Sequence, residues 1–363
     1  MSLSCGIVGL PNVGKSTLFN ALTKKIVAAE NYPFCTIDPN IGIVPLEDPR
    51  LKHLTLLSNS EKTIPATVSF VDIAGLVKGA SQGEGLGNKF LSNIRETDAI
   101  VQVIRCFEDP DVIHVEGKID PIQDIEVINL ELILADLQMV ENIVQKLEKG
   151  ARGKKESPET LILMKKIMDH LNQNLSVRSL DFTKEEKQIL KSYSFLSAKK
   201  ILYVANVGEE DLPAMDNAYV RAVKEYAEKE NSPVIPICAK LEEEVAQLDE
   251  EEVMGFLKEL GLKETGLAKL TRSAFDLLGL ITFLTTGEVE TKAWTIRQGM
   301  TAAQAAGAIH SDIEKGFIRA EVVSFQDMIE YKGRVGAREA GKARSEGRDY
   351  IVHDGDVILF FHN

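Results

Sequence analysis

The sequence predicts a mixed α/β fold, in which a parallel sheet flanked by helices is interrupted by a helical arm and followed by a small β-grasp module. Three observations predict it: short apolar runs alternate with helical segments, one long stretch has apolar residues at helical spacing, and the C-terminal part has strands around one helix. We expect the main domain at residues 1–128 and 199–277, the arm at residues 129–198 and the module at residues 278–363.

Short apolar runs of strand length predict the sheet of the main domain. Helical segments separate several of them, and this alternation is typical of parallel strands joined by crossover helices. The expected strands are residues 3–9, 66–73, 99–105, 200–206 and 233–238, and the expected helices are residues 15–24 and 88–97.

The arm is predicted because residues 128–196 break this alternation. Two runs of apolar residues recur there at helical spacing, and a stretch rich in Gly, Lys, Ser and Pro at residues 150–158 separates them. We interpret the runs as two long helices that fold back on each other as an antiparallel arm. A compact helical subdomain is the alternative.

The C-terminal part returns to short strands. A Gly-Glu turn between two β-rich runs predicts a hairpin, and a threonine before an Ala-rich run predicts a capped helix. Strands around one helix favour a β-grasp module. The expected strands are residues 281–285, 289–295, 320–325, 350–352 and 357–361, and the expected helix runs from Thr301 to about Lys315.

Composition predicts a soluble cytoplasmic protein. Hydrophobic residues make up 44% and charged residues 27% of the 363 residues, which is ordinary for a globular chain. No apolar run approaches the roughly 18 residues that span a bilayer. The first residues, MSLSCGIVGL, lack the basic segment of a signal peptide. The four cysteines are scattered without metal-ligand spacing, which indicates free thiols in a reducing compartment.

The net charge of −13 argues against a general nucleic-acid binder. Two segments nevertheless carry a net positive charge. The first basic segment, residues 146–200, has 13 Lys and Arg against 7 Asp and Glu, and the second, residues 332–348, has 6 against 2. Such segments on an acidic protein could meet a polyanion such as RNA, or could be solvated surface. Charge alone leaves both readings open.

The strongest motif is the segment GLPNVGKST at residues 9–17. It fits the pattern G-x-x-x-x-G-K-[S/T] and lies between an expected strand and an expected helix. Glycines let backbone N–H groups turn toward phosphate oxygens, and the N-terminus of a helix favours an anion. We expect Lys15 to reach the β- and γ-phosphates and the Ser16 hydroxyl to bind Mg²⁺. The motif therefore predicts a P-loop nucleoside triphosphatase.

A second motif, Asp72-Ile73-Ala74-Gly75, follows an expected strand. We expect Asp72 to contact Mg²⁺ through water and the Gly75 N–H to reach the γ-phosphate. The glycine-dense residues 79–87 indicate either a switch whose order depends on that phosphate or simply a flexible loop. Thr36, in the segment NYPFCTID between the two motifs, is placed to close on Mg²⁺ and the γ-phosphate.

The base-binding segment departs from the guanine-reading pattern N-K-x-D. Residues 206–209 are Asn-Val-Gly-Glu, so Val replaces Lys and Glu replaces Asp. Glu is one methylene longer than Asp, which displaces its carboxylate toward the base and disturbs the pairing with the two guanine donors. Residues 238–240, Cys-Ala-Lys, stand where a backbone N–H supports the base. A pocket altered in this way should tolerate or prefer adenine, and we expect ATP to be favoured over GTP.

The group that orients the attacking water is not the glutamine that many switch GTPases place after D-x-x-G. Residue 76 is Leu, whose side chain cannot orient water. Asn12 could bind a K⁺ ion that bridges the phosphates, as an arginine finger would, or could cap the loop backbone. His114, on the polar connection after the strand at residues 99–105, is a second candidate, although most lone histidines are structural or solvated.

Together these motifs closely resemble the YchF subfamily of Obg-related P-loop proteins, the Obg-like ATPases. The resemblance rests on GLPNVGKST, NYPFCTIDPNIG, DIAGLVKGASQGEGLGN, the NVGE base motif and the C-terminal module, and it covers essentially the whole chain. It implies a Ras-like P-loop G domain, an inserted antiparallel helical coiled-coil arm and a C-terminal β-grasp module of the TGS type. It also implies ATP preference, Mg²⁺ held by Ser16 and Thr36, hydrolysis that depends on His114, and ribosome or RNA contacts through the arm and the TGS module.

The leading expectation is thus a slow Mg²⁺-dependent ATPase that acts as a ribosome-associated factor, with K⁺ as a candidate second cation. A guanine-specific regulatory GTPase and a ribosome-binding scaffold with incidental hydrolysis are the alternatives. The expected catalytic residues are His114 and Lys15, and the expected metal ligands are Ser16, Thr36 and Asp72. The expected nucleotide-binding residues are Asn12, Val13, Gly14, Lys15, Ser16, Thr17, Gly75, Asn206, Val207, Glu209, Cys238 and Ala239.

Overall fold

A computed structural model describes most of the chain, namely residues 3–27, 40–73, 86–109, 118–150 and 158–363. It divides into two compact units. The first unit consists of Met1–Ile43 and Ser69–Leu270, and the second of Val44–Val68 and Thr271–Asn363. In the described residues, no helix has the length and apolar character needed to cross a membrane.

This division differs from the expected boundaries at two places. Residues 271–277, expected at the end of the main domain, group with the C-terminal residues, and so does the longer stretch of residues 44–68. The physical reason is pairing: within this stretch, strand β3 (Lys62–Ile64) adds in parallel to strand β9 (Glu290–Arg297). The stretch therefore belongs to the sheet of the second unit.

The main sheet follows the expected α/β pattern. Its order is β2-β4-β1-β5-β6-β7, and the pairs β1–β4, β1–β5, β5–β6 and β6–β7 are parallel. All five expected strands are confirmed, and β5 and β6 have the expected bounds. The strands are β1 (Ser4–Val8), β2 (Ile41–Pro45), β4 (Thr67–Asp72), β5 (Ala99–Arg105), β6 (Lys200–Asn206) and β7 (Val234–Ile237).

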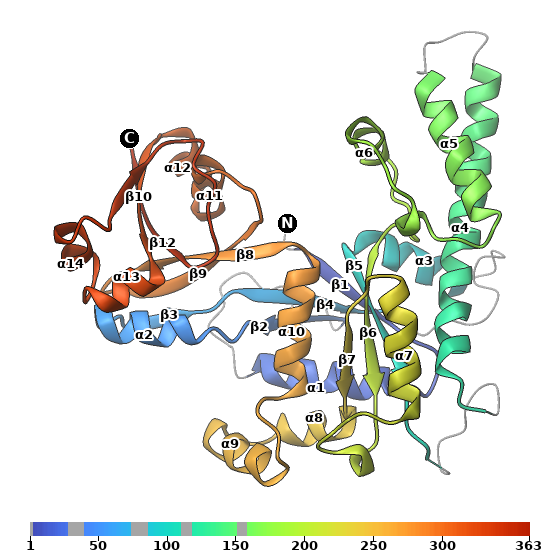
Figure 1. Cartoon of the computed structure of the whole chain (residues 1–363), viewed down its shortest axis with the longest axis horizontal. Coiled ribbons are helices and arrows are strands. Elements are labelled where there is room, and N and C mark those ends of the chain that lie inside the picture. The colour runs from blue at the N-terminus through green and yellow to red at the C-terminus, as the bar shows by residue number, and fades with distance from the viewer. Residues whose placement is uncertain (1–2, 28–39, 74–85, 110–117, 151–157) are drawn as a thin grey trace. The chain divides into compact units, whose positions relative to one another are not determined.

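Helices of the first unit connect and cover these strands (Figure 1). Apolar side chains of β5, β6 and the adjoining helices form one buried core, which includes Ile100, Ile104 and Tyr203. The helices are α1 (Lys15–Val27), α3 (Leu86–Glu96), α4 (Pro121–Gly150), α5 (Pro158–Leu171), α6 (Lys184–Leu190), α7 (Ala218–Lys229), α8 (Ala239–Val245) and α9 (Glu250–Glu259), followed by α10 (Gly266–Leu277), which continues into the second unit.

The inserted arm consists of α4 and α5, which lie side by side in Figure 1. Val140, Val144, Met164 and Ile167 are buried in a cluster shared by the two helices. The prediction of two long helices holds for α4, which has 30 residues, but α5 has only 14. The chain after α5 returns mainly through non-helical backbone and the short α6, so the second half of the arm is less regular than expected.

Buried polar contacts fix the base of the arm. The Asp136 carboxylate of α4 accepts hydrogen bonds from the backbone N–H groups of Leu196 (2.9 Å) and Ser197 (2.7 Å) and from the Ser197 hydroxyl (2.7 Å). Burial raises the pKa of Asp136, although these three donors oppose the shift. Nearby, Arg178 donates to Asn129 of α4 and to Glu230 at the end of α7. Specific hydrogen bonds therefore hold α4 to the returning chain of the arm and join the arm to the end of α7.

The second unit is a six-stranded sheet with the order β11-β10-β12-β8-β9-β3. The expected hairpin is confirmed, since β8 (Leu280–Thr286) and β9 pair antiparallel, and β10 (Phe317–Ser324) pairs antiparallel with β12 (Asp356–His362). Alanines of helix α11 (Ala302–Ile309) pack into the core against Phe283 and Ile358. This is the predicted β-grasp arrangement. The remaining elements are α2 (Pro49–Ser58), α12 (Ser311–Lys315), α13 (Phe325–Glu330), α14 (Arg334–Glu339) and β11 (Arg344–Glu346).

Two local predictions need correction. The helix expected from Thr301 to Lys315 does begin with a Thr301 capping box, but it is interrupted at His310, whose backbone is extended. The stretch at residues 350–352 is not a strand, because only Ile351 makes an isolated bridge, to Thr301. Its backbone instead bonds residues 300–302, since the Ala302 N–H donates to the Tyr350 carbonyl and the Val352 N–H to the Met300 carbonyl. A turn at residues 354–355 follows.

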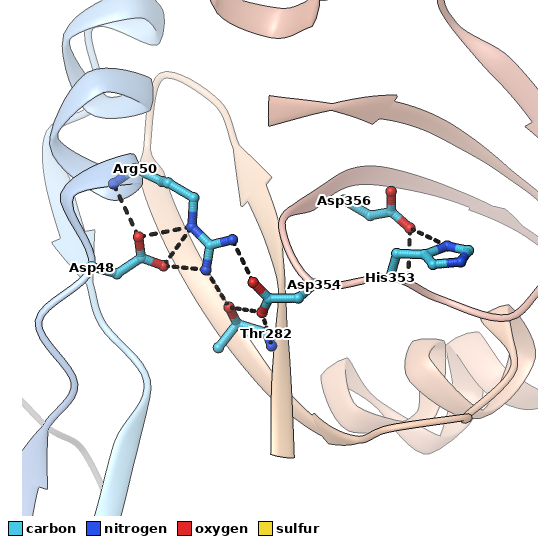
Figure 2. Close-up of polar contacts among 6 residues, drawn as sticks. All are labelled: Asp48, Arg50, Thr282, His353, Asp354 and Asp356. Atoms are coloured by element: carbon cyan, nitrogen blue, oxygen red, sulfur yellow. Dashed lines mark hydrogen bonds and ion pairs between the residues drawn. The ribbon is translucent and has the colours of Figure 1, made fainter. Parts of the chain in front are cut away.

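An ion-pair cluster joins helix α2 to that turn within the second unit (Figure 2). The Arg50 guanidinium donates to both carboxylate oxygens of Asp48, to Asp354 (2.7 Å) and to the Thr282 hydroxyl (3.0 Å). Asp354 also accepts from the Thr282 backbone N–H at 2.9 Å. Arg50 thus holds the start of α2 against the start of β8 and the turn, which explains why residues 44–68 group with the C-terminal residues.

Candidate nucleotide site

The expected nucleotide-binding residues lie at the carboxyl ends of neighbouring parallel strands. The P-loop follows β1, Asp72 ends β4, and Asn206 ends β6. Cys238 and Ala239 follow β7 and begin helix α8. In open α/β sheets, ligands bind at this edge. The topology therefore gathers segments that are far apart in the sequence.

The P-loop backbone has the conformation that its residue types favour. Asn12 has a φ of 64° and Gly14 a φ of +92°, both in the left-handed region that glycine and asparagine tolerate best. A Cβ atom at Gly14 would lie 2.1 Å from Nδ2 of Asn206, so no larger residue fits there without a shift. Helix α1 begins immediately afterward at Lys15, which leaves its first N–H groups at the loop.

Lys15 and Asp72 meet at this edge. The Lys15 Nζ donates to Oδ1 of Asp72, and their side chains are 11% and 24% exposed. The two residues expected to face a phosphate and a metal thus neutralise each other. Because a bound triphosphate would offer Lys15 stronger anionic partners, this pair is expected to exchange on binding.

The site also fits the metal that a P-loop protein requires. Ser16 is exposed in the first turn of α1, and the Asp72 carboxylate is at the adjacent strand end. Hydroxyl and carboxylate oxygens with bound water are ligands that Mg²⁺ prefers. Among the described residues, no group of three His, Cys, Asp or Glu could hold a metal. A Mg²⁺ ion here would therefore depend on Ser16, Asp72, water and the phosphates.

Asn206 joins the P-loop to the loop after β7. Its Nδ2 donates to the backbone carbonyl of Val13 at 2.9 Å, and its Oδ1 accepts from the backbone N–H of Ala239 at 3.0 Å. Asn206 is only 4% exposed, so both contacts are buried. This residue was expected to bind the nucleotide as part of the base motif, and in the structure its amide joins the P-loop to the start of α8.

The neighbouring base-motif side chains face the core. Val207, Cys238 and Ala239 are each no more than 2% exposed. The Val207 N–H donates to the backbone carbonyl of Ile237, which continues the pairing of β6 with β7. Burial raises the pKa of the Cys238 thiol, which therefore remains neutral at neutral pH. Only the backbone of these three residues is available to a nucleotide.

Glu209 is the exposed member of the base motif. Its Oε2 accepts a 2.6 Å hydrogen bond from Nζ of Lys240, the third residue of the Cys-Ala-Lys segment. The side chains are 46% and 67% exposed. Glu210 folds back over Gly208, since a Cβ at Gly208 would lie 2.1 Å from the Glu210 carboxylate. The carboxylate of the base motif is therefore already paired with a cation from the first turn of α8.

Hydrogen bonds fix the connection after β5 as far as Asp109, where the described residues pause. Arg105, 1% exposed, donates to the backbone carbonyls of Phe107 and Asp109, each at 3.2 Å. Asn217 donates to the Cys106 carbonyl at 2.7 Å. His114, expected farther along this connection, lies outside the described residues, as do Thr36 and Gly75. Their expected roles stay predictions.

Sequence reasoning missed two of these features. Arg105 closes an otherwise apolar strand, and a charged residue in such a position signals a buried partner, because isolated charges are rarely buried. Lys240 was noted only as part of the Cys-Ala-Lys segment. Its position 31 residues after Glu209 gives no local signal, and only the pairing of β6 with β7 brings the two side chains together.

The second basic segment, residues 332–348, is largely paired within its own unit. Arg334 and Arg338 contact Glu321 at 3.3 and 2.9 Å, and Arg344 lies 3.8 Å from Asp356. The hydrogen bond from Arg338 lowers the pKa of Glu321, and Arg334 adds to this against the effect of burial. These arginines stabilise the module, so their charge cannot be counted as free for RNA.

The first basic segment, residues 146–200, is also partly paired. Lys165 contacts Glu148 across the two arm helices at 2.7 Å, and Lys166 contacts Glu186 at 3.1 Å. All four side chains are at least 23% exposed, where ion pairs contribute little to stability and can exchange for another anion. An RNA contact by the arm stays a prediction.

Known proteins resemble this chain from end to end. It is 54% identical to the ribosome-binding ATPase YchF of Haemophilus influenzae and 52% identical to that of Bacillus subtilis, with all of each chain covered. The solved structure of the Schizosaccharomyces pombe YchF GTPase matches with a TM-score of 0.90 and 37% identity, over 99% of this chain and 98% of that one. A model described as a 50S ribosome-binding GTPase matches residues 4–146, and the YchF GTPase C-terminal model, described as a protein of unknown function, matches residues 280–363. The chain therefore belongs to the YchF family of P-loop nucleoside triphosphatases.

Proposed function

We propose that this protein is a cytoplasmic, Mg²⁺-dependent ATPase that prefers ATP to GTP, hydrolyses the γ-phosphate slowly and associates with the ribosome in a nucleotide-dependent way. The observation that carries the proposal is the convergence of Lys15, Ser16 and Asp72 at one sheet edge, beside the Asn206 bridge. Phosphoryl transfer in P-loop proteins depends mainly on positioning and charge, which these residues supply.

Each residue has a distinct role in this proposal. Lys15 binds the β- and γ-phosphates after leaving Asp72, and the P-loop N–H groups surround the phosphate oxygens. Ser16, Asp72 and Thr36 would hold Mg²⁺, which neutralises charge on the phosphates. Leu76 replaces a water-orienting side chain, so His114 is the candidate for that role and slow hydrolysis is expected. Asn12 is the candidate ligand for K⁺.

Preference for ATP rests on the base motif. Guanine presents two adjacent donors that a carboxylate accepts together, whereas here the carboxylate belongs to Glu209 and Lys240 occupies one of its oxygens. A site that cannot form the paired hydrogen bonds to guanine loses its preference for guanine over other bases. The bacterial relatives are named ribosome-binding ATPases, which supports a preference for ATP.

A guanine-specific regulatory GTPase is the second candidate. It is favoured by Asn206, which keeps the first position of the guanine-reading motif. The fission yeast relative and the matched domain family are also named GTPases. This candidate requires that guanine displace Lys240 from Glu209.

Ribosome association is proposed from the relatives' names and from the exposed, exchangeable ion pairs of the arm. Co-sedimentation of the purified protein with ribosomes, in ATP analogue, ADP or no nucleotide, tests it. We expect binding to differ among the three states. Equal binding in all three would instead indicate a scaffold for which hydrolysis is incidental, and absence of binding would refute the association.

Phosphate release by the purified protein tests the hydrolase itself. We expect slow release from Mg²⁺-ATP that is lost in Lys15→Ala together with tight nucleotide binding. His114→Ala should slow release but leave nucleotide affinity unchanged. An unchanged affinity in Lys15→Ala would refute the site, whereas unchanged turnover in His114→Ala would remove only His114 from the mechanism.

A further inference from the structure

The ion pair between Glu209 and Lys240 has a consequence for base selection. We propose that Lys240 is a specificity-determining residue, which disfavours GTP by occupying one oxygen of the Glu209 carboxylate. This inference rests on the proposed nucleotide hydrolase function and goes beyond it, because it assigns part of the base preference to a residue outside the Asn-Val-Gly-Glu motif.

The backbone positions of the two partners are fixed independently of the pair. Glu209 begins the short helical turn Glu209–Asp211, which two residues separate from the end of β6, and Lys240 is the second residue of α8. Asn206 bonds the Ala239 N–H at 3.0 Å, which holds the start of α8 beside the end of β6. Lys240 is therefore presented to Glu209 by the fold and does not reach it by chance.

The pair itself is short and open to solvent. Nζ of Lys240 lies 2.6 Å from Oε2 of Glu209, and both side chains are more than 45% exposed. The hydrogen bond to Glu209 raises the pKa of Lys240, so the ammonium is charged at neutral pH. A ligand at this edge of the sheet can therefore reach the pair and compete with it.

Guanine and adenine differ in what they require from this carboxylate. Guanine presents its ring N–H and exocyclic amine side by side, and a carboxylate pairs with both in the best geometry when each oxygen accepts one of them. Adenine presents one donor, its exocyclic amine, beside a ring acceptor. The Lys240 ammonium already draws on the charge of Oε2 and crowds one side of it, whereas Oε1 has no such partner in the pair. Guanine must therefore compete with Lys240 for Oε2, whereas adenine can use Oε1 alone.

The size of the effect follows from exposure. Exposed Lys–carboxylate pairs contribute little, so releasing this one should cost GTP an affinity factor of about two to five. Such a pair is screened by salt, with a Debye length of about 10 Å at 0.1 M. The penalty on GTP should therefore shrink as ionic strength rises. A side chain that only maintained the fold would give no such dependence.

The test is the ratio of GTP-analogue to ATP-analogue dissociation constants in the full-length protein with Mg²⁺. We expect Lys240→Ala to tighten GTP binding about two- to five-fold while ATP binding changes little, and Lys240→Arg to keep the wild-type ratio. Lys224→Ala is the matched control. Lys224, on α7, is also an exposed lysine, and its Nζ lies 3.0 Å from Oδ1 of Asp216. The wild-type ratio should fall at high salt and the Lys240→Ala ratio should not.

The outcomes separate this inference from the proposed function. If the wild type binds ATP more tightly and Lys240→Ala has the same ratio, the inference is refuted and the ATPase proposal stands. If the wild type prefers GTP but Lys240→Ala still strengthens GTP binding, the ATP preference is refuted and the role of Lys240 stands. A wild type that binds neither nucleotide refutes both.

Discussion

Asn206 offers the sharpest test of how the nucleotide site is built. Asn206→Ala removes the amide that bonds the Val13 carbonyl at 2.9 Å and the Ala239 N–H at 3.0 Å. Because Asn206 is 4% exposed, both backbone groups would be left buried without this partner. An unsatisfied buried polar group costs about 1–3 kcal/mol, so we expect a loss of about 2–6 kcal/mol in the free energy of unfolding of the first unit.

A graded series makes this prediction more specific. Asn206→Asp keeps an acceptor for the Ala239 N–H but places a buried carboxylate against the Val13 carbonyl oxygen, so its loss of stability should be at least as large as that of Asn206→Ala. Asn20→Ala is the control, because Asn20 is an exposed asparagine on α1. Urea unfolding followed by far-ultraviolet circular dichroism gives the stabilities, with Trp294 fluorescence as a separate reporter, since this single tryptophan lies in the second unit.

Nucleotide binding distinguishes positioning from direct base reading. If Asn206 holds the two loops together, Asn206→Ala should weaken ATP and GTP analogues by similar factors. A variant as stable as the wild type would refute the bridge. Loss of affinity for only one of the two nucleotides would instead show that the Asn206 amide reads the base.

Two further predictions concern the second unit and are measured by urea unfolding with Trp294 fluorescence. Arg50→Ala should destabilise this unit by about 2–3 kcal/mol, because it leaves Asp48 without its guanidinium partner and the Asp48 side chain is only 6% exposed. A smaller loss of stability than that of Asp354→Asn would contradict this. Glu321 has a pKa below its ordinary value of 4.5, so its stabilising effect is present above that pH and is lost as pH falls through the lowered pKa. Glu321→Gln should therefore flatten the acid side of the stability profile, and an unchanged slope would refute this.

The strands of the main sheet could be predicted because their signal is local. Residues 99–105 and 200–206 are apolar runs of strand length, and β5 and β6 have these same bounds because both strands are buried in the centre of the sheet. The P-loop was predicted for a similar reason, since its glycines and Lys15 carry their function at fixed spacing.

Residues 44–68 could not be placed from sequence alone. Helix α2 carries local signals, namely an Asp48 N-cap and a proline at the first helical position, so its existence could have been predicted. The partner of the segment could not, because β3 pairs with β9 across more than two hundred residues and Arg50 meets Asp354 through the same long-range packing. Such pairing depends on topology and leaves no local pattern.

The candidate site could likewise be predicted only in part. Which residues would surround a nucleotide followed from motifs, but what their side chains contact did not. The Asn206 amide bonds two backbone groups, and the Glu209 carboxylate is paired with Lys240, and neither contact was predicted. Both contacts join segments after β6 to segments after β1 or β7, so they arise only once the parallel sheet has formed.

The most direct test of the central claim is a competition titration of the purified wild-type protein with ATP and GTP analogues in Mg²⁺ and K⁺. We expect ATP to bind more tightly, because the only base-motif carboxylate at Glu209 already shares an oxygen with Lys240. Markedly tighter binding of GTP would contradict this account of the base pocket and would make the guanine-specific regulatory GTPase the better description of the protein.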